Sequence, residues 1–318
     1  MGTEGDIGPG SGEIDDSDGG VRPALRIRTA ETSTARRYGD FGYTVSGTGV
    51  TITGYTGPGG AVVIPTAING VPVTAIGESA FEGNTGITGV TIPDSVTGIG
   101  DMAFERCTGL VSITIPDSVT GIGVGVFRSC TGLVSVTLSH NLTVIEDSAF
   151  RGCTGLVSVG LAGVIIPDSV TGIRAGAFSR CTGLTDVTIP AGVTDIGNWA
   201  FAGSYNITGI TIQGPAVIGR SAFSYEDDFH GTGPALVNLR SLTIPRVTVI
   251  GEYAFFGSGL TGVTLPAGLT RIYRNAFENN ASLTGVILEG RGMEAGIPFD
   301  EVWERYLAGS IGVDTSGR

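Results

Sequence analysis

The sequence contains four cysteines: Cys107, Cys130, Cys153 and Cys181. Thiolates bind zinc, and pairs of thiols can form disulfides, but the C-x2-C spacing typical of a zinc site is absent. All four cysteines stand three residues after a phenylalanine of a repeated motif, where the other copies carry a small polar residue. Those residues are Asn84, Ser204, Ser258 and Asn280. Because all these side chains are short and can hydrogen-bond a turn, we expect a column of turn-satisfying donors with free thiols.

An acidic column is the second group with chemical potential. Asp94, Asp117 and Asp168 occupy one position of the repeat, and His140 takes the equivalent place in a third copy. A cation could sit between Asp117, His140 and Asp168. The alternative is a row of exposed turn residues, since aspartate is favoured in Pro-Asp-Ser turns. Neighbouring carboxylates in water repel by only about 1 kcal/mol, so the row needs no ion, and we expect no metal site.

The stretch 224–238 interrupts the repeat and brings Asp227, Asp228 and His230 close together in sequence. It could serve a metal-dependent enzyme or form a contact loop, and it could equally be a tolerated insertion. No Ser-His-Asp or Cys-His arrangement is recognisable elsewhere. All 18 basic residues are arginine, which excludes a phosphate-loop lysine and a Schiff-base lysine. We therefore expect no enzyme activity, no catalytic residue and no cofactor.

The elements that must position these residues follow from internal repetition. A phenylalanine recurs at intervals of 23, 23, 23, 28, 23, 22, 32 and 22 residues, and an isoleucine precedes each one by five positions. Self-similarity at such a period is typical of solenoid proteins. The phenylalanines are Phe81, Phe104, Phe127, Phe150, Phe178, Phe201, Phe223, Phe255 and Phe277.

Each repeat reads as one coil of chain. In residues 112–115 the apolar and polar side chains alternate, which predicts a short half-buried strand. Pro116 then ends the pairing, because proline cannot donate to a ladder, and Ile122 and Phe127 belong to a returning wall. A single coil cannot bury enough surface to fold alone, so its faces must be covered by neighbouring coils.

The predicted fold is therefore a repeat solenoid of the leucine-rich-repeat type, with one short parallel strand per coil of about 23 residues, about nine coils, and caps at both ends. Residues 1–40 form an acidic and polar segment that we expect to be disordered. Residues 41–75 alternate in short runs and predict an N-terminal β cap. The solenoid covers residues 76–290, and residues 291–318 predict a helical cap and tail, since Phe299, Val302 and Trp303 share one helical face.

The motif Ile99-Gly100-Asp101-Met102-Ala103-Phe104, continued by Cys107, Leu110 and Ile113-Thr114-Ile115-Pro116, resembles the BspA-like, treponemal-type leucine-rich repeat family. The resemblance covers about residues 60–290. Members of that family are largely bacterial surface or secreted proteins associated with adhesion to host proteins and to other cells. The resemblance implies an adhesive role at the cell surface or in secretion, and it implies no catalytic residues.

Composition limits the partners. The chain has 30 acidic and 18 basic residues, a net charge of −12, which disfavours nucleic acid. No run of 18 apolar residues occurs, so we expect no membrane insertion. The first residues lack the basic and then apolar pattern of a signal peptide, so we expect none in this chain.

The outward side of the strands is the expected partner-binding surface. Its side chains are small and mostly hydroxylated, without the aromatic anchors of interface hot spots, which favours weak, multivalent contacts. We expect a non-enzymatic protein-recognition module that acts as an adhesin and binds other proteins, possibly on host cells; the alternatives are an assembly scaffold and a metal-dependent enzyme using residues 224–238. The expected contact residues are Thr91, Ser112, Thr114, Ser135, Thr137, Ser158, Asp186, Thr188, Thr211 and Thr264.

Overall fold

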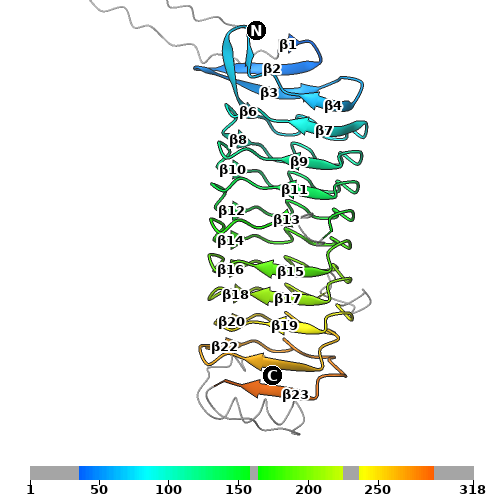
Figure 1. Cartoon of the computed structure of the whole chain (residues 1–318), viewed down its shortest axis with the longest axis vertical. Coiled ribbons are helices and arrows are strands. Elements are labelled where there is room, and N and C mark those ends of the chain that lie inside the picture. Colours follow the sequence, from blue (N-terminus) through cyan, green and yellow to red (C-terminus); the bar gives the residue numbers. More distant parts are fainter. Residues whose placement is uncertain (1–35, 158–163, 225–235, 290–318) are drawn as a thin grey trace, which may run out of the picture. The chain divides into compact units, whose positions relative to one another are not determined.

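The computed structural model describes residues 36–157, 164–224 and 236–289. These residues form β-strands and turns, and no helix occurs among them. The chain winds through about ten turns of about 23 residues, each stacked on the one before it (Figure 1). The predicted leucine-rich-repeat solenoid is therefore confirmed.

One wall of the stack is a series of parallel strands that run beneath the predicted contact residues. Within the described residues the series is hydrogen-bonded in three sheets of five, three and two strands. We call its solvent-facing side the strand face. The strands are β4 (Gly60–Val63), β7 (Ile87–Thr91), β9 (Ser112–Thr114), β11 (Ser135–Thr137), β13 (Val164–Ile165), β15 (Asp186–Ile189), β17 (Gly209–Ile212), β19 (Ser241–Thr243), β21 (Gly262–Leu265) and β23 (Gly285–Leu288).

A second wall, which we call the isoleucine ladder, also forms parallel strands, so most coils have two strands where one was predicted. Apart from the first, these strands have only two residues, too few for an alternating pattern to reveal them in the sequence. Each ends on the isoleucine that stands five residues before the phenylalanine. The strands are β6 (Val71–Ile76), β8 (Gly98–Ile99), β10 (Gly121–Ile122), β12 (Val144–Ile145), β14 (Gly172–Ile173), β16 (Asp195–Ile196), β18 (Val217–Ile218), β20 (Val249–Ile250) and β22 (Arg271–Ile272).

The N-terminal strands cover the first coil. β1 (Arg36–Tyr38) pairs antiparallel with β2 (Phe41–Ser46), which pairs antiparallel with β3 (Gly49–Tyr55). β3 then pairs in parallel with β6 and so passes the sheet on to the isoleucine ladder. β5 (Ala67–Ile68) and β6 form a further hairpin. The first strand thus begins at Arg36, before the boundary expected at residue 41, while the segment 1–35 and the predicted C-terminal helix lie outside the described residues.

The insertions interrupt the strand ladders at different levels. The ladder beneath the strand face is broken between β13 and β15 and between β19 and β21, next to the two insertions. The isoleucine ladder is continuous at both places and is broken instead between β10 and β12. No coil boundary in the described chain therefore loses both ladders.

A third set of hydrogen bonds runs along the turn that carries each phenylalanine. The backbone N–H of Phe104 donates to the carbonyl of Val126 at 2.9 Å, and that of Phe127 donates to Ala149 at 2.8 Å; the other coils repeat this bond. Two residues of each turn take a positive φ, one two positions before the phenylalanine and one two positions after it, as Met102 (53°) and Arg106 (58°) illustrate. The turn is therefore defined by its backbone, whatever the side chain.

The core is a stack of aromatic rings along the solenoid axis. Phe81 and Phe104 lie 4.9 Å apart between ring centroids, and each later pair is separated by 5.1–5.5 Å with nearly parallel planes. Tyr55 and Phe41 of the N-terminal strands extend this stack beyond the repeats. Each ring is covered by rings of the coils above and below, which is why a single coil cannot be stable alone.

Candidate functional site

The strand face brings the predicted contact residues into rows along the stack. Thr114 pairs with Thr137 between β9 and β11, and Thr188 pairs with Thr211 between β15 and β17. Most of these side chains are exposed, while Ser135 and Thr211 are half-buried. The intervening residues point inward, as the 3% exposed Ile113 does. Alternation along the strand and parallel in-register pairing together produce this surface.

The fourth coil departs from the sequence expectation. Ser158 lies outside the described residues, and the strand of this coil is β13, in which Ile165 pairs with Thr137. Ile165 is 62% exposed, although the sequence suggested a structural role for this apolar insertion. The 28-residue interval between Phe150 and Phe178 was the only signal of this shift.

Sequence reasoning also missed part of the strand face after the second insertion. Ser241 and Thr243 of β19 are exposed, and Thr243 pairs with Thr211. The motif Ser-Leu-Thr-Ile-Pro, which repeats the Ser-Ile-Thr-Ile-Pro of an earlier coil, could have identified them.

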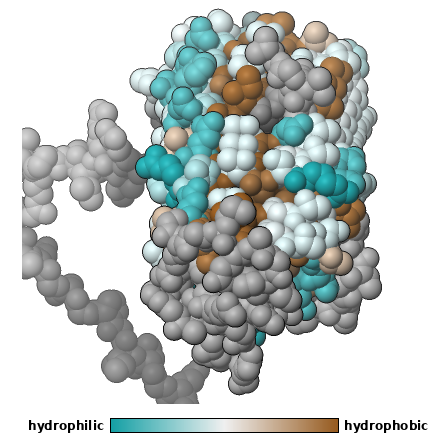
Figure 2. All heavy atoms as spheres, turned by 60° about the horizontal axis from the view of Figure 1, so that its bottom comes forward, coloured by the Kyte–Doolittle hydropathy of each residue, from teal (hydrophilic) through white to brown (hydrophobic). Residues whose placement is uncertain are grey.

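The strand face combines hydroxyl groups with exposed methyl groups. Val111 and Val134, which directly precede β9 and β11, are 49% and 38% exposed. Asp186 is the acidic residue of these strands, and none of their described residues is aromatic. Over the surface seen in Figure 2, hydrophilic, intermediate and apolar side chains are interleaved. This surface can make many small contacts but offers no deep anchor.

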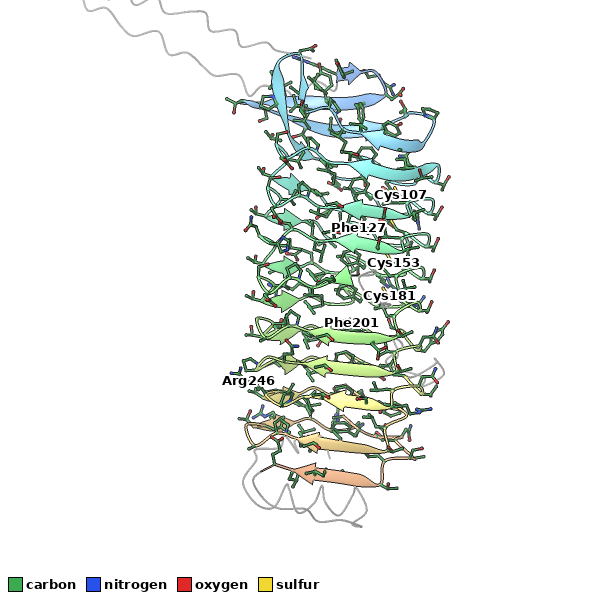
Figure 3. All side chains as sticks on the ribbon, in the orientation of Figure 1. Cys107, Phe127, Cys153, Cys181, Phe201 and Arg246 are labelled. Atoms are coloured by element: carbon green, nitrogen blue, oxygen red, sulfur yellow. The ribbon has the colours of Figure 1, made fainter. Side chains whose placement is uncertain are left out.

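The cysteine column is buried and makes the predicted hydrogen bonds. The Sγ atoms of Cys107, Cys130 and Cys153 donate to the carbonyl oxygens of Phe81, Phe104 and Phe127 of the preceding coil at 3.0–3.1 Å. In the coil after the cysteines, the hydroxyl of Ser204 donates to Phe178 in the same way at 2.9 Å. Figure 3 shows Cys107, Cys153 and Cys181 beside the stacked phenylalanines. The predicted role of this position as a donor column is confirmed.

Burial controls the ionisation of these thiols. It raises the pKa of Cys107 and of Cys181 to about 12, and it raises the pKa values of Cys130 and Cys153 further. A nucleophilic or metal-binding cysteine needs the thiolate form, which these surroundings disfavour. All four are free cysteines in the structure, and their surroundings suit hydrogen-bond donation rather than catalysis.

The structure brings together two members of the acidic column. His140 Nδ1 lies 3.0 Å from Asp117 Oδ1, and the backbone N–H of His140 donates to the same oxygen at 2.8 Å. The backbone bond and the ring contact hold the pKa of Asp117 below its usual value. The carboxylate therefore closes a turn between coils, as the turn interpretation predicts.

The remaining enzyme candidate lies mostly outside the described residues, since 225–235 include Asp227, Asp228 and His230. In the described part of the chain, no three His, Cys, Asp or Glu residues are grouped as a metal site would require. A search of the same residues for a long apolar helix that could cross a bilayer finds none.

Comparison with known proteins agrees with this geometry. A family model described as the BspA-type leucine-rich repeat region matches residues 67–163, 157–230 and 235–294, in six copies. The chain is similar to a crystal structure of a leucine-rich repeat protein from T. pallidum, with 34% identity over 56% of this chain and 81% of that one and a TM-score of 0.51. It is also similar to a leucine-rich cell surface protein from Faecalibacterium prausnitzii A2-165, with 24% identity over 82% and 96% of the two chains and a TM-score of 0.47. No curated protein matches the chain.

Proposed function

Because the chain belongs to the BspA-type leucine-rich repeat family, we propose that it is a non-enzymatic recognition module that binds other proteins through the strand face. The observation that carries this proposal is the row of exposed residues on successive parallel strands, including Thr114, Thr137 and Thr188. Each coil offers nearly the same small contact to the outside. The backbone beneath is held by its neighbours, so binding costs little ordering of the surface.

The chemistry of the strand face favours weak but repeated contacts. Its hydroxyl and methyl groups can form hydrogen bonds and small apolar contacts with an extended or repetitive partner surface. Without Trp or Tyr anchors, each contact contributes little alone. Several coils, or several copies displayed together, increase the overall affinity through effective concentration. This is the behaviour of an adhesin, and we place it at the cell surface or in the secreted fraction on the basis of the family resemblance.

Two glycines allow a matched test of the strand face. Gly89 lies in β7 on the strand face and Gly98 lies in β8 on the isoleucine ladder; a Cβ at either position would meet no atom within 4 Å, and neither has a positive φ. Gly89→Arg and Gly98→Arg therefore add the same bulky charged side chain to two different walls of adjacent coils. Both variants are expected to fold, as thermal unfolding will verify.

The assay uses purified host cell-surface and matrix proteins, with the full chain either as a soluble monomer or displayed in many copies on beads. We expect saturable binding that is much stronger on beads, that Gly89→Arg weakens and that Gly98→Arg leaves unchanged. Absence of saturable binding to every protein of the panel would refute the adhesive role. An equal loss in both variants would show that the strand face is not the contact surface.

A further inference from the structure

Four arginines occupy the same turn in four successive coils: Arg106, Arg128, Arg151 and Arg180. Each stands one or two residues after a stacked phenylalanine, and we call the group the arginine column. Acidic residues exceed arginines by 30 to 18 in the chain as a whole, so this concentration runs against the composition. It lies on the turn that carries the phenylalanines, and thus on a surface separate from the strand face.

Backbone hydrogen bonds align the arginine column. The N–H of Arg106 donates to the carbonyl of Arg128 at 2.8 Å, and the N–H of Ser129 donates to Arg151 at 2.7 Å. In the next coil, the N–H of Gly152 donates to Ser179, the residue before Arg180, at 2.8 Å. Because stacked parallel strands repeat at about 4.8 Å, the column presents about one guanidinium per such step in a straight line.

A buried carboxylate orients the first two members. Glu105 is 3% exposed, and its Oε1 lies 3.4 Å from Arg128 Nε and 3.7 Å from Arg106 Nε. One negative charge is therefore shared between two positive charges, which leaves a positive excess. The side chains of Arg106 and Arg128 remain 62% and 39% exposed, so solvent and ligands can reach them.

The last member extends the line toward the next coil. The Cγ of Arg180 lies 3.2 Å from the place that a Cβ of Gly203 would take. Because Gly203 has no side chain, Arg180 can lie along the solenoid axis across this coil. Tyr205, 36% exposed, follows two residues later and adds an aromatic ring to the turn.

The acidic residues of these turns precede the phenylalanines, and two of them are engaged by the backbone. The carboxylate of Asp101 accepts the N–H of Val124, and that of Asp147 accepts the N–H of Ala175, both at 2.8 Å. Glu146 adds a third negative charge on this side. These charges limit the attraction to ligands that approach the arginine column itself, within about a Debye length of 8 Å at physiological ionic strength.

We propose that the arginine column binds a linear anionic polysaccharide lying parallel to the solenoid axis, with its carboxylate or sulfate groups on successive arginines. Guanidinium groups recognise such oxyanions through paired hydrogen bonds. The step of about 4.8 Å between coils is close to the length of one sugar ring. An extended acidic peptide fits less well, because its same-side residues repeat every ~6.6 Å.

Arg106→Gln with Arg180→Gln tests the proposal, and Arg36→Gln with Arg246→Gln is the matched control. Each pair removes two positive charges from exposed positions, and the second pair lies outside the arginine column (Figure 3 labels Arg246). The substitutions retain a Cβ, so the backbone preference at Arg106 and Arg180 is unchanged. Glu105 and its partner Arg128 are left intact to avoid a buried, unpaired carboxylate.

Binding of heparin, of polygalacturonate oligosaccharides and of poly-glutamate is measured by titration calorimetry with the full chain at low and physiological salt. We expect salt-sensitive binding of at least one of the two polysaccharides, a Kd about tenfold higher in the Arg106/Arg180 variant, and no change in the control. The two polysaccharides distinguish sulfate from carboxylate. Failure of both to bind, an equal loss in the two variants, or equally tight binding of poly-glutamate would overturn the proposal. Gly89→Arg should leave this binding intact, so its outcome is separate from that of the strand face.

Discussion

The Sγ atom of Cys130 donates to the carbonyl oxygen of Phe104 in the preceding coil at a distance of 3.0 Å. The contact links the position beside the aromatic stack in one coil to the turn of the coil before it. The same relationship recurs through the cysteine column and is continued by Ser204. The chemical requirement at this position is thus a short donor, and a thiol meets it as a weak one.

The first prediction concerns the donor at residue 130. Cys130→Ser should retain the bond to Phe104, because Ser204 makes the same bond in a later coil. Cys130→Ala removes it, and we expect Cys130→Ala to be less stable than Cys130→Ser by about 0.5–1.5 kcal/mol, the usual net contribution of such a bond. Urea unfolding monitored by circular dichroism measures the difference. An alanine variant as stable as the serine variant would show that the bond contributes nothing.

The second prediction concerns alkaline pH. Burial raises the pKa of Cys107 and of Cys181 from 9.0 to about 12, so the folded state retains protons that the unfolded chain loses. The stability from this source is complete below about pH 9 and decreases as the pH rises toward 12. We expect the urea midpoint to fall between pH 9 and pH 11. The doubly substituted Cys107→Ser, Cys181→Ser chain should show a smaller fall, and an identical fall would assign the effect to other groups.

The third prediction uses two glycines with different backbones. Gly125 has a φ of 61°, in the left-handed region, and we expect Gly125→Ala to destabilise the chain by about 1 kcal/mol. Gly98 has no positive φ, and a Cβ there meets nothing within 4 Å. Gly98→Ala should therefore stabilise by about 0.4–1 kcal/mol through the unfolded state. Thermal unfolding of both variants tests the opposite signs; a change of the same sign in both would contradict this assignment of the turn.

The fourth prediction concerns the aromatic stack. Phe127 is fully buried between Phe104 and Phe150, with ring centroids 5.5 and 5.4 Å away. Phe127→Ala should cost about 3–5 kcal/mol, because it removes the ring and leaves a cavity within the stack. Phe127→Leu keeps most of the volume and should cost less. Denaturant unfolding measures both, and equal losses for the two variants would mean that ring volume at this position is not limiting.

The repeat made the fold predictable because each coil imposes the same requirements on the same positions. The columns of isoleucine, phenylalanine and cysteine correspond to the isoleucine ladder, the aromatic stack and the hydrogen-bonded donors. The second strand of each coil was not foreseen, since Gly98–Ile99 is too short to show a periodic pattern. Its pairing becomes visible when the neighbouring coil is in place.

Interruptions of the repeat limited the prediction of the surface. The interval of 28 residues between Phe150 and Phe178 does not reveal which residues re-enter the sheet. In the structure, Val164 pairs with Val136, and Ile165 takes the exposed position beside Thr137. The arginine column was also overlooked, because Arg106 and Arg128 occupy different positions of the motif and meet through Glu105, a contact between coils.

The sequence by itself determined the solenoid, its period and which side chains lie inside, because these depend on spacing and on the polarity of each residue. Only the tertiary structure decided which coils share a ladder, how the insertions shift the strand face, and where charges of successive turns come together. The physical reason is that hydrogen bonds and ion pairs depend on distances between atoms of neighbouring coils. The period fixes the order of these atoms along the stack, whereas their separation depends on how each coil packs on the next.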